Sequence, residues 1–364
     1  MTERNGRPSR DQFLGCLLGG AIGDALGYPI EFRSLAEIKR AFGDSAPQDL
    51  PGWPTRKAEV SDDTQMTLFT AEGIIRANQR FKDRGIVNVM TVIQGSLLRW
   101  LATQTGDGGE RWTDPMRRGW LLNEPRLHAR RAPGTTCLSS LQRVVREGEV
   151  PTVQHPPNAS KGCGAVMRSA PLGLAARDRE QAFEWGRDAG VLTHGHPSGY
   201  LAAGYLASMV YDVVRGSAVE AAMTAADDLL RGEPGHEELA EAIDRARATA
   251  KLGVLSAEAV EQLGGGWVGE EALAIAIACT VTAKTASQED VSDALWRAVA
   301  HSGDSDSTGS ITGNLLGAVV GARRLPVRWV GEIELGDVVE RVADDLYETF
   351  VAGKALDQQR YPPN

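Results

Sequence analysis

Apolar residues recur at helical spacing along most of the chain, and no segment shows the strict alternation of apolar and polar residues that marks a half-buried strand. Val219, Ala222 and Ala226 follow this spacing, and a capping box of Ser287 and Asp290 precedes another such run. We therefore predict an all-α fold. The predicted helices cover residues 64–80, 86–104, 135–147, 197–216, 218–232, 236–253, 268–284, 288–301, 308–323 and 336–352.

The apolar segment that begins at Phe13 carries glycines at every fourth position: Gly15, Gly19, Gly23 and Gly27. On a helix, residues four apart share a face, so these glycines would form a row without side chains. Each interior glycine costs a helix about 1 kcal/mol relative to alanine. We therefore expect another element, most simply a second helix, to approach the backbone along this row.

Two isolated acids, Asp24 and Glu31, belong to the same apolar segment. An unpaired charge is costly in such surroundings, so each acid is expected to cap a helix or to pair with a partner. Glu31 follows Pro29 at the end of the segment and is free to point into a cleft.

Two short acidic runs stand near opposite ends of the chain, Ser61-Asp62-Asp63-Thr64 and Asp304-Ser305-Asp306-Ser307-Thr308. Either run alone is most simply a helix N-cap, with acids that favour the positive end of the helix dipole. Together they would form an all-oxygen ligand set for hard divalent cations such as Mg²⁺ or Mn²⁺. The second run also resembles a calcium loop, but Leu315 stands where that loop needs its bidentate glutamate.

If the two acidic runs meet, they belong to one domain. The 364 residues permit one large domain or two ordinary ones. We therefore expect a disordered tail at 1–12, a single domain at 13–353 and a C-terminal tail at 354–364.

Composition narrows the classes of partner. The formal charge of -9, from 39 basic and 48 acidic residues, lacks the basic footprint of a nucleic-acid binder. No uninterrupted apolar stretch reaches the roughly 18 residues of a membrane span, so a membrane is not expected either. The four cysteines include no Cys-x-x-Cys pair, which fits a reducing cytoplasm better than a disulfide framework. They are Cys16, Cys137, Cys163 and Cys279.

A polar segment with several glycines, PTVQHPPNASKGCGAVMRSAPLGLA, leads into a predicted helix from about Gly164. Backbone N–H groups at a helix N-terminus attract phosphate, and Ser160 and Lys161 would add donors; the alternative is an ordinary cap. Further along, His194 and His196 suggest zinc. Zinc needs three or four such ligands and no other histidine lies nearby in sequence, so a hydrogen bond to the core or to a ligand is favoured.

Taken in order, these motifs resemble the ADP-ribosylglycohydrolase family, which includes dinitrogen-reductase-activating glycohydrolase and the ADP-ribosyl-arginine and ADP-ribosyl-serine hydrolases. The resemblance covers about residues 12–323. It rests on GCLLGGAIGDALGYPIEF, SDDT, NASKGCGAVMRSAPLGL, THGHPSGY and HSGDSDSTGSITGNLLGA. It implies a compact orthogonal bundle of many helices and an enzyme that removes ADP-ribose from modified proteins.

The resemblance also implies roles for single residues. Glu31 matches the acid that, in the serine-directed branch of the family, gates the site and acts in acid/base catalysis; Asp62 and Asp63 are the other implied catalytic residues. The implied ligands of two Mg²⁺ or Mn²⁺ ions are Ser61, Asp62, Asp63, Asp304, Asp306 and Ser307, with Thr308 in reserve for Ser307. Ser160, Gly162 and Gly164 match a diphosphate-binding loop, and His194 matches a substrate contact. Cys163 stands where family members often have asparagine.

By the same resemblance, a metal-activated water attacks the anomeric carbon of ADP-ribose while Glu31 or a metal-site aspartate protonates the leaving group. An arginine-linked target is favoured by family prevalence, and serine is also possible. The alternatives are a hydrolase of other ADP-ribose conjugates or of nucleotides, and a non-catalytic relative like the lens crystallins of this fold. Retention of every expected ligand favours an enzyme.

Overall fold

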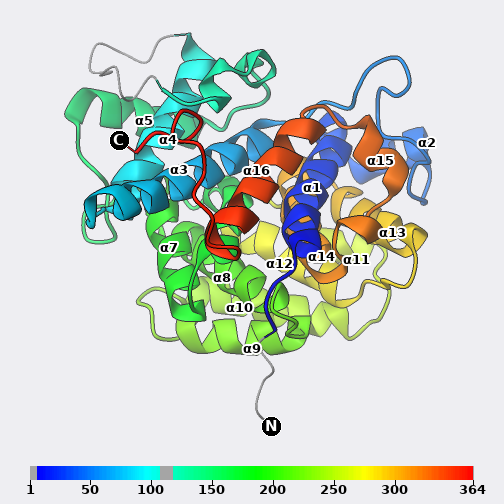
Figure 1. Cartoon of the computed structure of the whole chain (residues 1–364). Helices are drawn as coiled ribbons and strands as arrows, with labels where there is room; N and C mark the ends of the chain where they lie inside the picture. The colour runs from blue at the N-terminus through cyan, green and yellow to red at the C-terminus, as the bar shows by residue number, and fades with distance from the viewer. Residues whose placement is uncertain (1–5, 107–117, 364) are drawn as a thin grey trace.

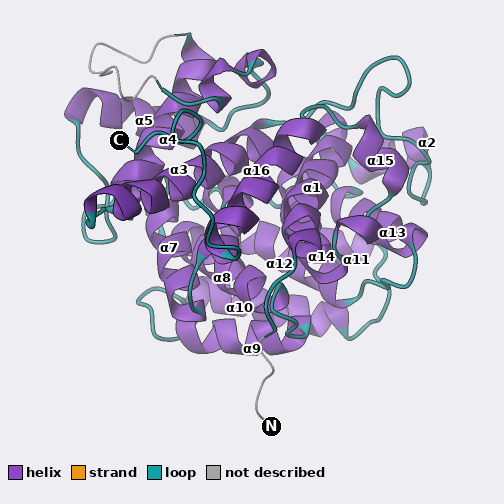
Figure 2. Ribbon diagram, in the orientation of Figure 1, coloured by secondary structure: helices purple, strands orange, loops and turns teal. Residues whose placement is uncertain are grey.

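A computed structural model describes residues 6–106 and 118–363, and these residues form sixteen α-helices joined by loops and 3-10 turns, without a β-sheet (Figures 1 and 2). The predicted all-α fold is confirmed. The helices are α1 Arg10–Gly27, α2 Leu35–Phe42, α3 Asp62–Arg84, α4 Val89–Thr105, α5 Thr135–Glu147, α6 Ala170–Ala175, α7 Arg179–Val191, α8 Pro197–Val213, α9 Val219–Leu230, α10 Glu237–Ala250, α11 Ala257–Glu261, α12 Gly269–Val281, α13 Gln288–Val299, α14 Ser305–Val320, α15 Val327–Glu332 and α16 Gly336–Phe350. The 3-10 turn η1 (Tyr28–Ile30) follows α1, and η4 (Cys163–Arg168) precedes α6.

Helices α1 and α14, from opposite ends of the chain, lie against each other along the glycine row (Figure 1). A Cβ placed on Gly19 would lie 2.2 Å from the carbonyl oxygen of Gly313, and one on Gly23 would lie 2.0 Å from that of Gly309. The expectation of a second helix at this row is therefore confirmed. Because the two helices run antiparallel, the end of α1 lies beside the start of α14.

A buried carboxylate fastens α3 to α1. Asp24 of α1 accepts hydrogen bonds from the backbone N–H groups of Ser61 (2.9 Å) and Thr64 (3.0 Å), and also from the Thr64 hydroxyl. These bonds satisfy donors of the first turn of α3 that lack partners within the helix. Asp24 is thus a cap supplied from another helix, and it holds the start of α3 beside the end of α1.

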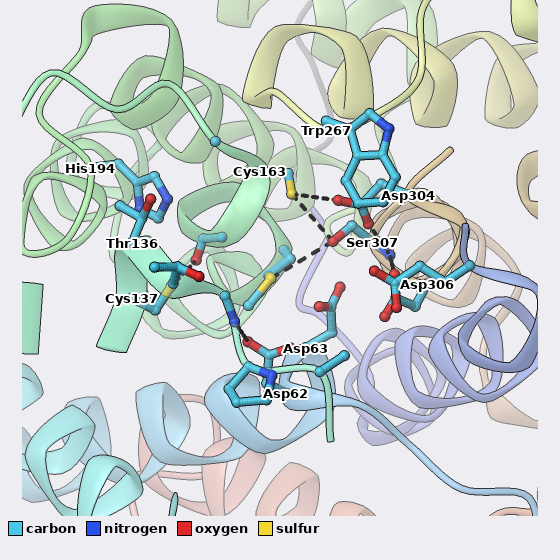
Figure 3. A pocket seen from close by; sticks show the side chains of 18 of the residues that line it. Asp62, Asp63, Thr136, Cys137, Cys163, His194, Trp267, Asp304, Asp306 and Ser307 are labelled. Atoms are coloured by element: carbon cyan, nitrogen blue, oxygen red, sulfur yellow. Dashed lines mark hydrogen bonds between the residues drawn. The ribbon is translucent and has the colours of Figure 1, made fainter. Parts of the chain in front are cut away.

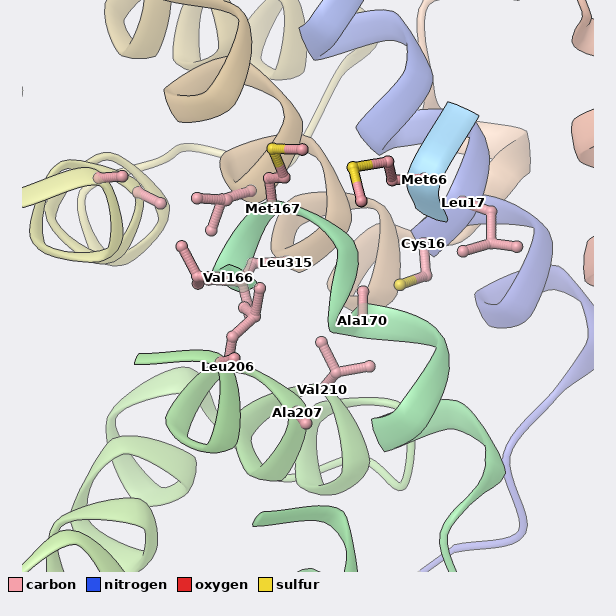
Figure 4. Close-up of a cluster of buried hydrophobic side chains, with 14 of the residues drawn as sticks. Cys16, Leu17, Met66, Val166, Met167, Ala170, Leu206, Ala207, Val210 and Leu315 are labelled. Carbon is pink, nitrogen blue, oxygen red and sulfur yellow. The ribbon is translucent and has the colours of Figure 1, made fainter. Parts of the chain in front are cut away.

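The hydrophobic core joins these helices to the middle of the chain. Figure 4 shows Leu17 of α1, Met66 of α3 and Leu315 of α14 in the same cluster as Val166 of η4 and Val210 of α8. All five side chains are buried in one hydrophobic cluster. The turn η4 therefore has a fixed position relative to the ends of α3 and α14.

Helix α1 begins inside the segment expected to be a tail. Ser9 and Gln12 form a reciprocal capping box that starts the helix at Arg10, so the tail expectation is wrong for residues 10–12. Residues 1–5 lie outside the described part of the chain. Among the described residues, only the segment Arg10–Ile30 has the length and apolar composition of a membrane span. Of its most apolar window, 89% is buried inside the protein.

The segment after residue 353 is also folded against the rest of the chain where the structure describes it. Tyr361 is buried, and its hydroxyl donates a hydrogen bond to Asp345 of α16 (2.9 Å). The C-terminal tail is therefore held against α16 through Tyr361.

Candidate active site

A cavity of about 380 Å³ opens where α1 and η1 end and where α3, α5, α14 and η4 begin (Figure 3). Its size lies within the usual range for small-molecule sites. The lining residues are Glu31, Phe32, Asp62, Asp63, Ala132, Pro133, Gly134, Thr135, Thr136, Cys137, Gly162, Cys163, Gly164, Met167, His194, Trp267, Asp304, Asp306 and Ser307.

Five carboxylates face this cavity. Asp62 and Asp63 belong to the first turn of α3, Asp304 is the N-cap of α14, and Asp306 lies in its first turn. Glu31 follows η1, and one carboxylate oxygen from each of Glu31, Asp304 and Asp306 lies within 4.8 Å of the other two. The structure thus brings both acidic runs to one site. Each run is a helix cap as well, so the two interpretations of these runs are compatible.

The carboxylates lack the positive charge that would balance them. Burial raises the pKa values of Asp62, Asp63 and Asp306 well above the usual range, and the charges of neighbouring carboxylates, chiefly Asp24 and Asp304, add to this effect. Between described residues, no ion pair within 4.0 Å joins a lysine or arginine to any of these three; Arg131, for example, pairs with Glu334. The chemistry of the site therefore fits divalent cations.

Asp63 gives the most specific sign of a missing partner. Its side chain is 2% exposed, and its Oδ2 atom has no hydrogen-bond partner. A buried carboxylate oxygen without a partner is costly unless a ligand satisfies it. In Figure 3 the Asp63 carboxylate points into the cavity toward Ser307. This orphaned oxygen supports the fit of a cation to the site.

Glu31 lies at the rim of the same cluster. Partial burial, followed by the charges of Asp304 and Asp24, raises its pKa to about 8. A carboxyl group with such a pKa holds a proton near neutral pH, as a general acid must.

The expected serine ligands take different positions. Ser307 lines the cavity, whereas the hydroxyl of Thr308 bonds to His301 (2.9 Å), so the geometry favours Ser307. Ser61 is not among the lining residues. Its hydroxyl accepts a hydrogen bond from the N–H of Asp63 (3.2 Å) and so caps α3.

The loop before η4 is held by its own hydrogen bonds. Ser160 does not line the cavity, and its hydroxyl accepts from the N–H of Gly162 (3.3 Å). The N–H of Cys163 donates to the carbonyl oxygen of Trp267 (3.2 Å). Lys161 pairs with Glu270 (2.7 Å), so the expectation that Lys161 would donate to a phosphate is wrong.

His194 is buried at one wall of the cavity. Its ring lies close enough to Gly164 that a Cβ there would be 3.0 Å from the ring carbon Cε1. Burial, assisted by the charge of Arg168, lowers its pKa to about 3, so the imidazole is neutral. Its Nδ1 atom is 2.8 Å from the Thr193 hydroxyl, which leaves Nε2 for a ligand. No candidate metal group among the described residues includes His194 or His196.

The sequence predicted helix α5, but neither the place of its first residues in the site nor that of an aromatic pair. Thr135 and Thr136 line the cavity at the N-terminus of α5, where no side chain caps the helix. Phe32 and Trp267 line the opposite part and stack with ring centroids 5.0 Å apart. Phe32 is 74% exposed and has a φ of 66°, a strained conformation for an aromatic residue. The Pro-Gly-Thr-Thr sequence before the predicted helix at 135–147 was the available signal for α5.

Comparisons with known proteins agree with this architecture. The protein-family model for ADP-ribosylglycohydrolase matches residues 6–355. The chain is 25% identical to the ADP-ribosyl-[dinitrogen reductase] glycohydrolase of Rhodospirillum rubrum, over 95% of this chain and 98% of that protein. It is 23% identical to the ADP-ribosylarginine hydrolase Tri1 of Pseudomonas putida (strain GB-1), over 96% of this chain and 82% of that protein.

A solved structure shares the fold. It is described as an ADP-ribosylglycohydrolase-related protein complex, and it superposes with a TM-score of 0.65 at 23% identity, over 93% of this chain and 98% of the other. The match of the family model spans nearly all of the described residues. The chain therefore belongs to the ADP-ribosylglycohydrolase family of enzymes.

Proposed function

We propose that this protein is a metal-dependent hydrolase that removes ADP-ribose from modified arginine side chains of proteins. The observation that carries the proposal is the set of five carboxylates from distant parts of the chain around one cavity, with Asp63 Oδ2 unpartnered. Two relatives whose names specify ADP-ribosyl targets support the reaction class.

Two Mg²⁺ or Mn²⁺ ions would be held by the oxygens of Asp62, Asp63, Asp304, Asp306 and Ser307. When bound, such cations supply Lewis acidity toward the ribose oxygens and toward the attacking water. Ser61 is a weaker candidate as a ligand, because its hydroxyl already caps α3.

The side chains of this protein would move two protons during hydrolysis. Water attack at the anomeric carbon releases one proton, which the carboxylate of Asp63 would accept, since it points into the cavity (Figure 3). Glu31, with a pKa raised to about 8 by burial and by Asp304, would give its proton to the departing nitrogen. Proton loss and proton gain are thus assigned to different carboxyl groups, as in other glycoside hydrolases.

The diphosphate would bind at the uncapped N-terminus of α5, beside Thr135 and Thr136, because unpaired N–H groups and the helix dipole attract anions. The glycines of the expected diphosphate loop, Gly162 and Gly164, would let the ligand approach the backbone closely. His194 would donate or accept one hydrogen bond as a neutral imidazole.

The aromatic pair favours arginine over serine as the modified residue. Phe32 and Trp267 expose 74% and 42% of their surfaces, and both line the same cavity as Glu31. A planar guanidinium group binds well to aromatic faces with an acid nearby, whereas a serine hydroxyl gains little from them.

The test is hydrolysis of two substrates, a peptide ADP-ribosylated on arginine and one ADP-ribosylated on serine, with Mg²⁺, Mn²⁺ or EDTA. We expect ADP-ribose release from the arginine peptide with either cation and none with EDTA. Preferential release from serine would overturn the arginine assignment. Undiminished release with EDTA would overturn metal dependence, and activity on free ADP-ribose conjugates alone would overturn the protein target.

A further inference from the structure

Cys163 occupies a position among the acidic side chains that the proposed function does not use. Its Sγ atom lies 2.9 Å from Oδ2 of Asp304 and 3.5 Å from Oγ of Ser307, and Figure 3 shows it pointing into the cavity. The backbone of Cys163 is fixed by its hydrogen bond to Trp267, so the sulfur is held in this position.

These distances suit ligands that share one metal ion. Metal–sulfur and metal–oxygen bonds of about 2.3 and 2.1 Å place neighbouring sulfur and oxygen ligands roughly 3.1–3.6 Å apart. The two contacts of Cys163 lie close to this range. Small side-chain movements would bring all three atoms within bonding distance of a shared cation.

A second observation points to a ligand at the same place. Asp63 lines the cavity and is only 2% exposed. Its Oδ2 atom nevertheless has no hydrogen-bond partner. The Asp63 carboxylate points toward Ser307, and the Ser307 hydroxyl contacts the Cys163 sulfur (Figure 3). Cys163, Ser307 and Asp63 therefore face the same part of the cavity.

We propose that Cys163 is a metal ligand and that, with Asp304, it gives this site affinity for a thiophilic divalent cation, Zn²⁺ or Cd²⁺. Thiolate sulfur prefers such ions, whereas Mg²⁺ and Mn²⁺ prefer the carboxylate oxygens alone. The inference rests on the proposed function in one respect only, that a cation occupies the space between the two acidic runs.

The chemical step is a simple exchange without electron transfer. The S–H bond of Cys163 breaks, a metal–sulfur bond forms, and the proton leaves to solvent. The Asp304 carboxylate, which already accepts a hydrogen bond from this thiol, provides the first acceptor.

Cys137 provides a matched control within the same cavity. Its Sγ atom also faces the lining, but its hydrogen bond goes to the carbonyl oxygen of Gly164 at 3.9 Å and to no carboxylate. The remaining thiols, Cys16 and Cys279, are buried in the hydrophobic core. Only Cys163 combines a cavity position with a carboxylate contact among the four cysteines, all of which are described.

The test is a titration of the full-length, EDTA-treated protein with Cd²⁺. Binding is monitored by the ultraviolet charge-transfer absorption of the cadmium–thiolate bond. We expect this absorption in the parent and in Cys137→Ser, and its loss in Cys163→Ser. Calorimetry should show Cd²⁺ affinity reduced about tenfold or more in Cys163→Ser, with Mg²⁺ affinity little changed. Circular dichroism and thermal melting of each variant establish that it is folded.

Absorption that persists in Cys163→Ser would overturn the inference. It would also be overturned if the parent protein bound Cd²⁺ without showing this absorption, or did not bind Cd²⁺ at all. Mg²⁺-dependent release of ADP-ribose is measured separately on the same preparations. Hydrolysis without a cadmium–thiolate signal would refute the role of Cys163 alone. A thiolate signal without hydrolysis would refute the proposed function and leave the metal ligand standing.

Discussion

Glu31 combines two properties that make it the residue most sensitive to substitution. It lies at the rim of the carboxylate cluster, and its pKa is raised to about 8 by burial and by Asp304. Replacing it with glutamine removes the transferable proton at nearly constant volume. We expect Glu31→Gln to lower kcat by about 10²–10⁴-fold, with a smaller change in KM. Steady-state kinetics on the arginine peptide measures kcat and KM, and Glu289→Gln, at an exposed position, is the control. A kcat of Glu31→Gln within twofold of the parent would contradict the role of Glu31 as general acid.

Phe32 should act on substrate affinity instead. A cation–π contact at an exposed site contributes about 0.5–1 kcal/mol, so Phe32→Ala should raise KM for the arginine peptide about two- to fivefold with kcat retained. Phe81 of α3, which is 55% exposed and lies outside the cavity lining, offers a matched control as Phe81→Ala. An equal effect of both substitutions, or a selective loss of kcat in Phe32→Ala, would show that the ring does not recognise the target.

At this scale the sequence predicted the acids well and their neighbours poorly. Asp62, Asp304 and Asp306 were recognisable because carboxylates cluster within a few residues of each other. Phe32 and Trp267 lie more than two hundred residues apart and meet only through the fold, so neither carries a local signal. Gly162 and Gly164 of the expected diphosphate loop line the cavity, whereas the sequence did not indicate that Ser160 and Lys161 bond to other groups of the protein.

At the scale of elements, the site depends on the close approach of α1 and α14. A Cβ on Gly23 would lie 2.0 Å from the carbonyl oxygen of Gly309, which is backbone and cannot move aside. Gly95 of α4, by contrast, has only Arg99 Nη1 at 3.9 Å. We expect Gly23→Ala to lower the free energy of unfolding by about 1–3 kcal/mol or more. Gly95→Ala should raise it by up to about 1 kcal/mol. Urea unfolding measures both, and equal effects would contradict the packing.

The regular spacing of these glycines made the contact between α1 and another helix predictable, because interior glycines destabilise a helix unless close packing compensates. Helices α2, α7, α11 and α15 lie outside the predicted ranges. Three of them, α2, α11 and α15, have eight residues or fewer, which is too short for helical periodicity to be distinctive. The capping role of Asp24 was also open in the sequence. Its partners Ser61 and Thr64 lie on a different helix, so only the tertiary structure could identify them.

For the whole molecule, the concentration of buried acids predicts how stability depends on pH. The pKa values of Asp24 and Glu31 are raised to about 6 and about 8, so the folded state binds more protons than the unfolded state between about pH 4 and pH 8. Stability of the metal-free protein should therefore fall as pH rises through this window. Thermal melting in EDTA from pH 5 to pH 8 measures this pH dependence. A Tm that stays constant or rises with pH would contradict the raised pKa values of the buried acids.

Divalent cations should reverse this loss, because they bind the deprotonated carboxylates of the folded protein. Added Mn²⁺ is expected to raise Tm more at pH 8 than at pH 5, since fewer protons must be displaced. The Asp304→Asn, Asp306→Asn double variant should lose most of this stabilisation. An equal Mn²⁺ effect in parent and variant would place the ion elsewhere.

Anomalous scattering of Mn²⁺ in crystals of the full-length protein would locate the cations between the two acidic runs. The account predicts two peaks in the cavity, between the first turns of α3 and α14 and within coordination distance of Asp62, Asp63, Asp304 or Asp306. Peaks only at other places, or an empty cavity in crystals that hold Mn²⁺ elsewhere, would contradict it.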